Sequence, residues 1–190
     1  MGLGGWMIQE GYMLQTSGFA NAQYQIREKT GVLDRGLVKQ MGDLGLLGMD
    51  FPEEYGGMGG DFRHEAIIAE QMGWKGIDGF GITLHNAIIA PYIETFGTEA
   101  QKRKYLPKMA SGELITAIAM TEPGTGSDLA SIASTARKDG DRYILNGSKT
   151  FITNGINSDI IIVAAKTDPT QRHTGMSLMI VERSMVGFER

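Results

Sequence analysis

The sequence predicts an α+β protein in which a bundle of helices is followed by an antiparallel β-sandwich or barrel. Before residue 113, apolar residues recur at helical spacing, whereas after it short β-branched runs alternate with turn residues. The chain has 190 residues, 42% of them hydrophobic and 21% charged, which is enough to bury a core. We therefore expect a helical domain over residues 1–113 and a β-domain over residues 114–190.

The helical half contains several segments with recognisable ends. Residues 33–47 place Leu37, Met41, Leu44 and Leu47 on one helix face, whereas residues 10–29 are only weakly periodic. Asp61 can cap a helix that runs towards Trp74. The next helix covers about residues 82–96, and Pro91 inside it predicts a kink or a break. Thr98 to Gln101 forms a capping box that opens a helix ending near residues 111–112.

The second half contains runs with the composition of β-strands. Asn146-Gly147 is a strong signal for a hairpin turn, which we expect to connect the strand before it to the one after it. The run at residues 159–166 is rich in β-branched residues. The predicted strands cover residues 115–120, 131–138, 143–145, 149–153, 159–166 and 176–182.

Composition excludes several classes of function. A net charge of −4 and a pI near 5.4 argue against a nucleic-acid partner. The chain has no cysteine, and its three histidines have no ligand spacing, so no metal site is predicted. Its apolar runs fall far short of the roughly 20 residues of a membrane span. Residues 1–13 have no basic region typical of a signal peptide, and we expect an intracellular protein.

The most informative stretch is AMTEPGTGSD, residues 119–128, where a predicted strand becomes a turn. Such a loop can direct several backbone N–H groups at one acceptor, and Thr121 and Ser127 add hydroxyl donors. The stretch lacks the lysine of a phosphate loop and is not a GxGxxG motif. Taken alone, its composition fits an ordinary turn between strands better than a ligand site.

The second informative stretch is NGSKTFITNG, residues 146–155. In a strand, Phe151 and Thr153 would share one face, with Ile152 on the other. An aromatic ring beside a hydroxyl could stack on a flat ring and bond to its edge. Taken alone, this pattern is more typical of a phenylalanine in a sandwich core and a surface threonine.

Together, the two stretches resemble the middle β-domain of the acyl-CoA dehydrogenase family, whose TEPGxGSD and WITNG segments hold FAD. Residues 51–61 resemble that family's PEEYGGxGGD segment, and residues 94–107 its YGTEEQKxKYLP helix. The four motifs occur in the family's order, so the resemblance covers residues from about 32 to the end. Residues 117–121 and 145–149 are most similar to the long-chain-specific members.

This resemblance implies FAD-dependent α,β-dehydrogenation of acyl-CoA thioesters in fatty acid β-oxidation, with an electron-transfer flavoprotein as the electron acceptor. The positions matching Met120 and Thr121 contact the edge of the isoalloxazine ring. Phe151 replaces the tryptophan usual in many members and is expected to cover the ring face, while Thr153 reaches the N5 atom. The implied cofactor-binding set is Met120, Thr121, Gly126, Ser127, Phe151, Ile152 and Thr153, and Ser127 is also implied to contact the CoA part of the substrate.

The family's general base is a glutamate in a C-terminal helical domain, which we expect to be absent from this chain. We therefore assign no catalytic residue, describe the chain as an incomplete acyl-CoA dehydrogenase fold, and expect it to bind FAD weakly without turning over acyl-CoA. At full length a homodimer or homotetramer is expected, in the cytoplasm of a bacterium or the mitochondrial matrix of a eukaryote. The alternatives are an acyl-CoA oxidase and a non-catalytic module that binds FAD or CoA.

Overall fold

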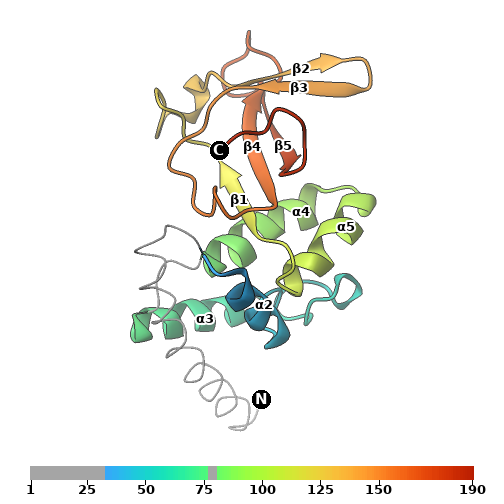
Figure 1. Cartoon of the computed structure of the whole chain (residues 1–190), viewed down its shortest axis with the longest axis vertical. Helices are drawn as coiled ribbons and strands as arrows, with labels where there is room; N and C mark the ends of the chain where they lie inside the picture. Colours follow the sequence, from blue (N-terminus) through green and yellow to red (C-terminus); the bar gives the residue numbers. More distant parts are fainter. Residues whose placement is uncertain (1–32, 77–80) are drawn as a thin grey trace. The chain divides into compact units, whose positions relative to one another are not determined.

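A computed structural model describes residues 33–76 and 81–190, and the weakly periodic stretch at 10–29 lies outside this range. The chain divides into two compact units, with the boundary between Ile115 and Thr116 (Figure 1). The first unit is helical and the second contains one five-stranded sheet. The predicted order of helices before strands is therefore confirmed.

Within residues 33–76 and 81–115, the helical unit contains four α-helices, and two of them begin with the predicted capping signals. The Asp61 side chain accepts a hydrogen bond from the backbone N–H of Arg63, and Thr98 and Gln101 form the reciprocal bonds of a capping box. The helices are α2 (Arg35–Asp43), α3 (Phe62–Lys75), α4 (Ala90–Phe96) and α5 (Glu99–Ala110). Their core includes Leu33, Leu37, Val38, Met41, Leu46, Leu47, Ile68, Ile82 and Ile115.

Pro91 lies where a helical segment changes its hydrogen-bond pattern. The chain forms a π-helix over Leu84–Ile89, and α4 begins at Ala90 with the proline in its first turn. The helical backbone continues through this point, because the N–H of Ala90 still donates to the carbonyl of His85 in the π pattern. No break occurs at Pro91: the disruption there is a change from π- to α-helical hydrogen bonding, and the wider π-turn places His85 and Asn86 in the interior of the unit.

The sheet of the second unit is mixed, so the prediction of a purely antiparallel architecture is wrong. β1 (Thr116–Ala119) runs parallel to the central β4 (Ile160–Lys166), which pairs antiparallel with β5 (Met176–Glu182). A parallel pair needs a long crossover, and the 40 residues between β1 and β4 supply one. Ala117, Ala119, Ile161 and Val163 form an apolar cluster on one face.

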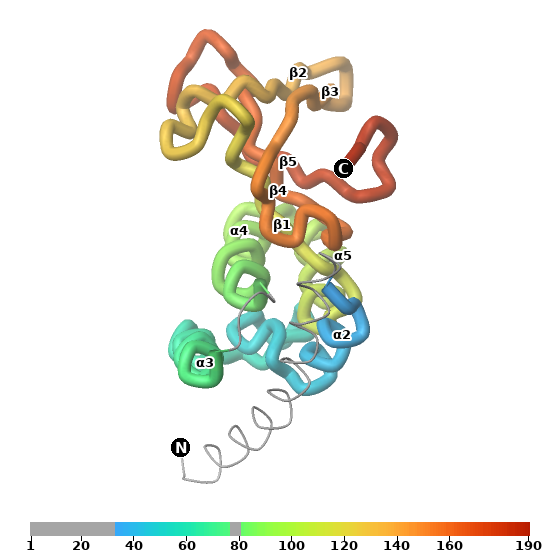
Figure 2. Tube along the Cα trace, turned by 60° about the vertical axis from the view of Figure 1, so that its left-hand side comes forward, coloured from blue at the N-terminus to red at the C-terminus, as the bar shows by residue number. Residues whose placement is uncertain are grey.

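The crossover contains a hairpin of β2 (Thr135–Asp139) and β3 (Arg142–Asn146) (Figure 2). Its turn lies at residues 140–141, where Gly140 has a φ of 63°. The prediction of a hairpin turn at Asn146-Gly147 is therefore wrong, because an equally suitable Gly-Asp pair, Gly140-Asp141, precedes it by six residues. The strand predicted at residues 149–153 is also absent.

Two buried side chains of the helical unit have shifted pKa values, and the two shifts change stability with pH in opposite directions. Glu65 accepts a hydrogen bond of 2.9 Å from Nδ2 of Asn86, and desolvation together with the charge of Asp50 raises the pKa of Glu65 to about 7. Nε2 of His85 donates to the carbonyl of Met109 at 3.2 Å, and burial lowers the pKa of His85 to about 4. Glu65 is therefore protonated more readily when folded, and His85 less readily.

These shifts predict a pH-dependent stability that one substitution reveals. Between pH 4.5 and 7 the folded Glu65 keeps a proton that the unfolded chain releases, so stability falls as the pH rises. Between pH 4 and 6.5 His85 has the opposite effect, because only the unfolded imidazole holds its proton. In Glu65→Gln we expect the free energy of unfolding to rise by about 1 kcal/mol per pH unit from pH 4.5 to 6. Urea denaturation followed by circular dichroism measures this slope.

The wild-type chain is the reference, with a much flatter profile over the same range because the two contributions oppose each other. His85→Gln should show the reverse slope, a stability that falls as the pH rises. Identical profiles in the wild type and both variants would contradict the two assignments.

Candidate functional site

The loop after β1 is closed by a tight turn. The backbone N–H of Glu122 donates to the carbonyl of Thr125 at 2.9 Å, and the N–H of Thr125 donates back at 3.0 Å. Pro123 and Gly124 form the tip, where proline fixes φ and glycine leaves space. The hydroxyl of Thr125 also donates to the carbonyl of Ser131 at 3.3 Å. This loop is therefore held in one shape before it reaches the exposed residues Gly126 and Ser127.

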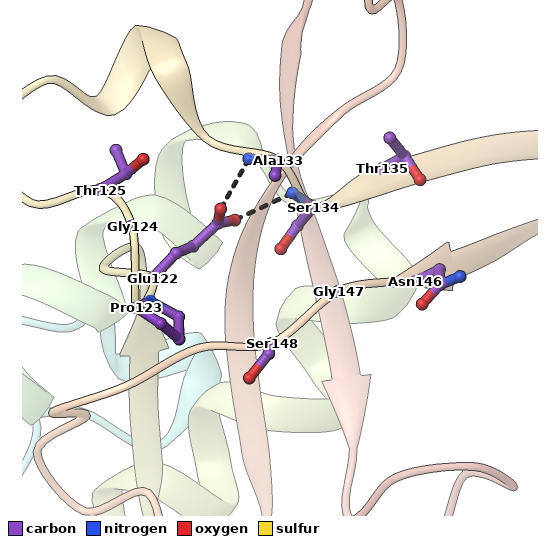
Figure 3. A pocket seen from close by; sticks show the side chains of 10 residues that line it. All are labelled: Glu122, Pro123, Gly124, Thr125, Ala133, Ser134, Thr135, Asn146, Gly147 and Ser148. Atoms are coloured by element: carbon purple, nitrogen blue, oxygen red, sulfur yellow. Dashed lines mark hydrogen bonds between the residues drawn. The ribbon is translucent and has the colours of Figure 1, made fainter.

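The carboxylate of Glu122 points into the unit rather than towards solvent. It accepts hydrogen bonds from the backbone nitrogens of Ala133 at 2.6 Å and Ser134 at 3.0 Å (Figure 3). Nζ of Lys149 lies 2.9 Å from the same carboxylate, and the two side chains are only 6% and 10% exposed. Desolvation raises the pKa of Glu122, but these hydrogen bonds outweigh it and lower the pKa to about 2.

Two further bonds connect this loop to the segment after β3. Nζ of Lys149 also donates to the carbonyl of Met120 at 2.9 Å. The backbone N–H of Thr150 donates to the carbonyl of Thr121, again at 2.9 Å. We call these five residues, Met120, Thr121, Glu122, Lys149 and Thr150, the clamp. It brings together the two stretches that the sequence analysis singled out.

Residues 149–154 form an arch whose two ends are fixed. The clamp holds its first end, and at the other end the buried Asn154 donates from Nδ2 to the carbonyl of Thr116 at 3.4 Å. Phe151 and Asn154 have positive φ values of 55° and 62°. This left-handed backbone replaces the predicted strand, so the strict alternation of faces expected for Phe151 and Thr153 does not apply.

Phe151 combines strain with exposure. Its side chain is 93% exposed, so packing within the described residues does not hold it in the left-handed conformation. Such a conformation costs of the order of 1–2 kcal/mol for a residue with a Cβ, and such outliers cluster at functional sites. An exposed ring followed by the exposed Thr153 fits a flat aromatic ligand with polar atoms at its edge.

The seven predicted cofactor-binding residues are distributed over these features. Met120 and Thr121 lie in the clamp, and Phe151, Ile152 and Thr153 form the top of the arch, where Ile152 packs against the apolar cluster of the sheet. Gly126 and Ser127 lie beyond the Pro123-Gly124 turn, and no hydrogen bond among the described residues joins them to the arch. The structure thus brings the two stretches together at residues 120–122 and 149–150.

Sequence reasoning missed three parts of this site. It did not pair Glu122 with Lys149, and it did not identify Asn154 as an anchor. It also missed the backbone donors at residues 133–134. The only available signal was the presence of two acidic residues in the first stretch and one basic residue in the second, with Glu122 and Lys149 27 positions apart.

A pocket of about 360 Å³ lies beside the clamp (Figure 3). The hydroxyl of Ser134 is buried on its wall and has no hydrogen-bond partner among the described residues. Gly147 passes so close that a Cβ there would meet this hydroxyl oxygen at 2.1 Å. The complete lining is Glu122, Pro123, Gly124, Thr125, Ala133, Ser134, Thr135, Asn146, Gly147 and Ser148.

Neither a membrane helix nor a metal cluster is found in residues 33–76 and 81–190. No helix there has the length and apolar character needed to cross a bilayer. Nor do three histidine or acidic side chains gather there as metal ligands. The candidate site therefore consists of backbone groups, hydroxyls, one aromatic ring and one buried ion pair.

Comparison with known families matches both units. Residues 15–113 match the acyl-CoA dehydrogenase N-terminal domain, and residues 117–190 match the acyl-CoA dehydrogenase middle domain. The mitochondrial long-chain specific acyl-CoA dehydrogenase of Sus scrofa is 47% identical over 163 residues, which are 85% of this chain and 38% of that protein. The mitochondrial isovaleryl-CoA dehydrogenase of Pongo abelii is 45% identical over 155 residues, 79% of this chain and 36% of its own length.

Solved structures agree with these sequence matches. An acyl-CoA dehydrogenase from Geobacillus kaustophilus has a TM-score of 0.85 and 49% identity, covering 94% of this chain and 48% of its own. Butyryl-CoA dehydrogenase from Megasphaera elsdenii has a TM-score of 0.81 and 35% identity, covering 95% of this chain and 49% of its own. The chain therefore spans less than half the length of these relatives.

The strained backbone at Phe151 predicts a stabilising substitution. Glycine adopts a positive φ without strain, so Phe151→Gly should be about 1 kcal/mol more stable than Phe151→Ala, which keeps the strain. Neither substitution removes a packed side chain, since Phe151 is 93% exposed. The difference is measured by urea denaturation of the two variants. An alanine variant as stable as the glycine variant would show that the backbone is not strained.

Proposed function

We propose, because this chain belongs to the acyl-CoA dehydrogenase family, that it takes part in the FAD-dependent α,β-dehydrogenation of an acyl-CoA thioester. The observation that carries this proposal is the arch, which displays an aromatic ring and a hydroxyl beside a loop of backbone donors. When bound, FAD supplies the hydride acceptor, and the protein contributes position and electrostatics.

The residues around the clamp fit the flavin ring as follows. Phe151 covers one face of the isoalloxazine, and Thr153, two residues on, offers its hydroxyl to the N5 edge. Thr121 and the backbone at Met120 offer donors to the opposite, pyrimidine edge. Donors at these edges favour the charge that builds up on the ring as it is reduced. Ile152 lies between Phe151 and Thr153 in the sequence, and it anchors the arch by packing on the apolar cluster of the sheet.

Ser127 is proposed to contact the CoA part of the substrate, and Gly126 allows the loop to pass close to the cofactor. Both residues are exposed, beyond the closed turn of the loop, so a ligand can reach them without displacing core side chains. Relatives that act on different acyl groups match this chain about equally well, so the proposal names acyl-CoA thioesters as a class.

Glu122 is not proposed as the general base, although it lies in the loop. A base must take up a proton near the working pH, and the pKa of Glu122 is lowered to about 2. Its carboxylate is also engaged by three donors that hold it away from a substrate. We assign Glu122 a structural role and no catalytic base to this chain.

Electrons are proposed to pass to an electron-transfer flavoprotein. Dye reduction that depends on acyl-CoA, measured on the protein as its gene expresses it, tests the dehydrogenase reaction. Hydrogen peroxide formed from oxygen at a matching rate would favour an acyl-CoA oxidase instead. Protein that stays colourless after reconstitution with FAD, yet is retained by immobilised CoA, would favour a non-catalytic module.

Phe151 gives a direct test of cofactor binding. Removing the ring in Phe151→Ala should weaken FAD binding roughly tenfold, since stacking on one aromatic face contributes about 1–1.5 kcal/mol. Quenching of flavin fluorescence on titration with the protein measures this affinity. Tyr143→Ala is the matched control, because Tyr143 is an aromatic residue of the same unit that is 50% exposed. Equal affinities in the wild type and Phe151→Ala would refute the assignment.

A further inference from the structure

Lys149 occupies a position that is unusual for a lysine. Its side chain is only 10% exposed, and its ammonium donates both to the Glu122 carboxylate and to the Met120 carbonyl. Burying a charge pair carries a desolvation penalty that its attraction often does not exceed, so stability alone is a weak reason for one. The second acceptor, a backbone carbonyl, indicates a role in fixing the backbone.

The bond to Met120 has a consequence for the next residue. The peptide unit is planar and trans, so the carbonyl of Met120 and the N–H of Thr121 point in opposite directions. A cation held on that carbonyl therefore fixes the direction of the Thr121 N–H, which points away from Lys149. It also polarises the peptide and makes that N–H a stronger donor.

Lys149 acts on the arch as well, since it is the residue at the arch's first end. Its neighbour Thr150 donates to the Thr121 carbonyl at 2.9 Å, so the loop and the arch are joined on both sides of the Thr121 residue. Phe151, two residues after Lys149, has its left-handed conformation next to these bonds. The distance between the loop donors and the exposed ring thus depends on the Lys149 side chain.

We propose that Lys149 is a positioning residue for the flavin, acting through the Met120–Thr121 peptide and the arch. The inference rests on the proposed function. Lys149 does not touch the flavin; it sets where the ring-covering Phe151 and the edge-donating Thr121 stand relative to each other. The class of ligand that needs this spacing is a planar ring that is contacted on one face and one edge.

The test uses two variants of the full chain. Lys149→Met leaves Glu122 as an unpaired buried charge and is expected to lose stability as well as affinity. The double variant Glu122→Gln/Lys149→Met leaves no unpaired charge, so it should fold, yet it still lacks the bond to Met120. For the double variant we expect the FAD dissociation constant to rise roughly tenfold, because misplaced contacts of this kind weaken positioning. We also expect its flavin midpoint potential to fall, because a weaker donor favours the reduced ring less.

Two controls separate positioning from stability. Lys149→Arg keeps a cation and several donors. Its FAD affinity should therefore be closer to the wild-type value than the affinity of Lys149→Met. Ile162→Val removes one buried methylene from β4 and lowers stability without touching the clamp, so its affinity and potential should stay at wild-type values.

The outcomes are distinct. A double variant that folds and keeps both the wild-type FAD affinity and the wild-type potential overturns the role of Lys149 and leaves the proposed function intact. An Ile162→Val variant that loses affinity in parallel with stability also overturns it, because the effect would then follow stability alone. A wild-type chain without measurable FAD binding overturns the proposed function itself.

Discussion

The carboxylate of Glu122 lies where three separate stretches of the second unit meet: the loop after β1, residues 133–134 and Lys149. A carboxylate that is 6% exposed must have its charge satisfied by donors, because an unpaired buried charge is strongly destabilising. The three stretches therefore have to arrive at one point together. The shape of the loop, the start of β2 and the path of the arch all depend on this requirement.

Local signals in the sequence were sufficient for most of the elements. Asp61 and Thr98 mark helix starts, Pro91 marks the change from a π-helix to an α-helix, and the last strand covers the predicted residues 176–182. The pairing of strands was not accessible in this way, because β1 and β4 are partners across 40 intervening residues. The hairpin was misplaced because the sequence contains two suitable glycine turns, and only tertiary contacts choose between them.

The candidate site, too, was predictable in its local segments but not in the contacts between them. The two stretches that form it could be found from composition and motif resemblance, but their joining could not, since a lysine and a glutamate 27 residues apart carry no periodic signal. The arch was predicted as a strand because its residues are β-branched and aromatic. Its real conformation depends on anchors at Lys149 and Asn154, and a positive φ at phenylalanine has no signature in the sequence.

The close approach of Gly147 to Ser134 restricts how this region can change over evolutionary time. Even a methyl group at position 147 would clash with Ser134 and push apart the segment that follows β3 and the segment that precedes β2. Because the backbone N–H of Ser134 also donates to Glu122, a shift of Ser134 would displace the loop after β1 as well. Position 147 therefore tolerates only glycine without a change in the backbone. A residue such as Asp141, at the exposed hairpin tip, can be substituted without such a clash.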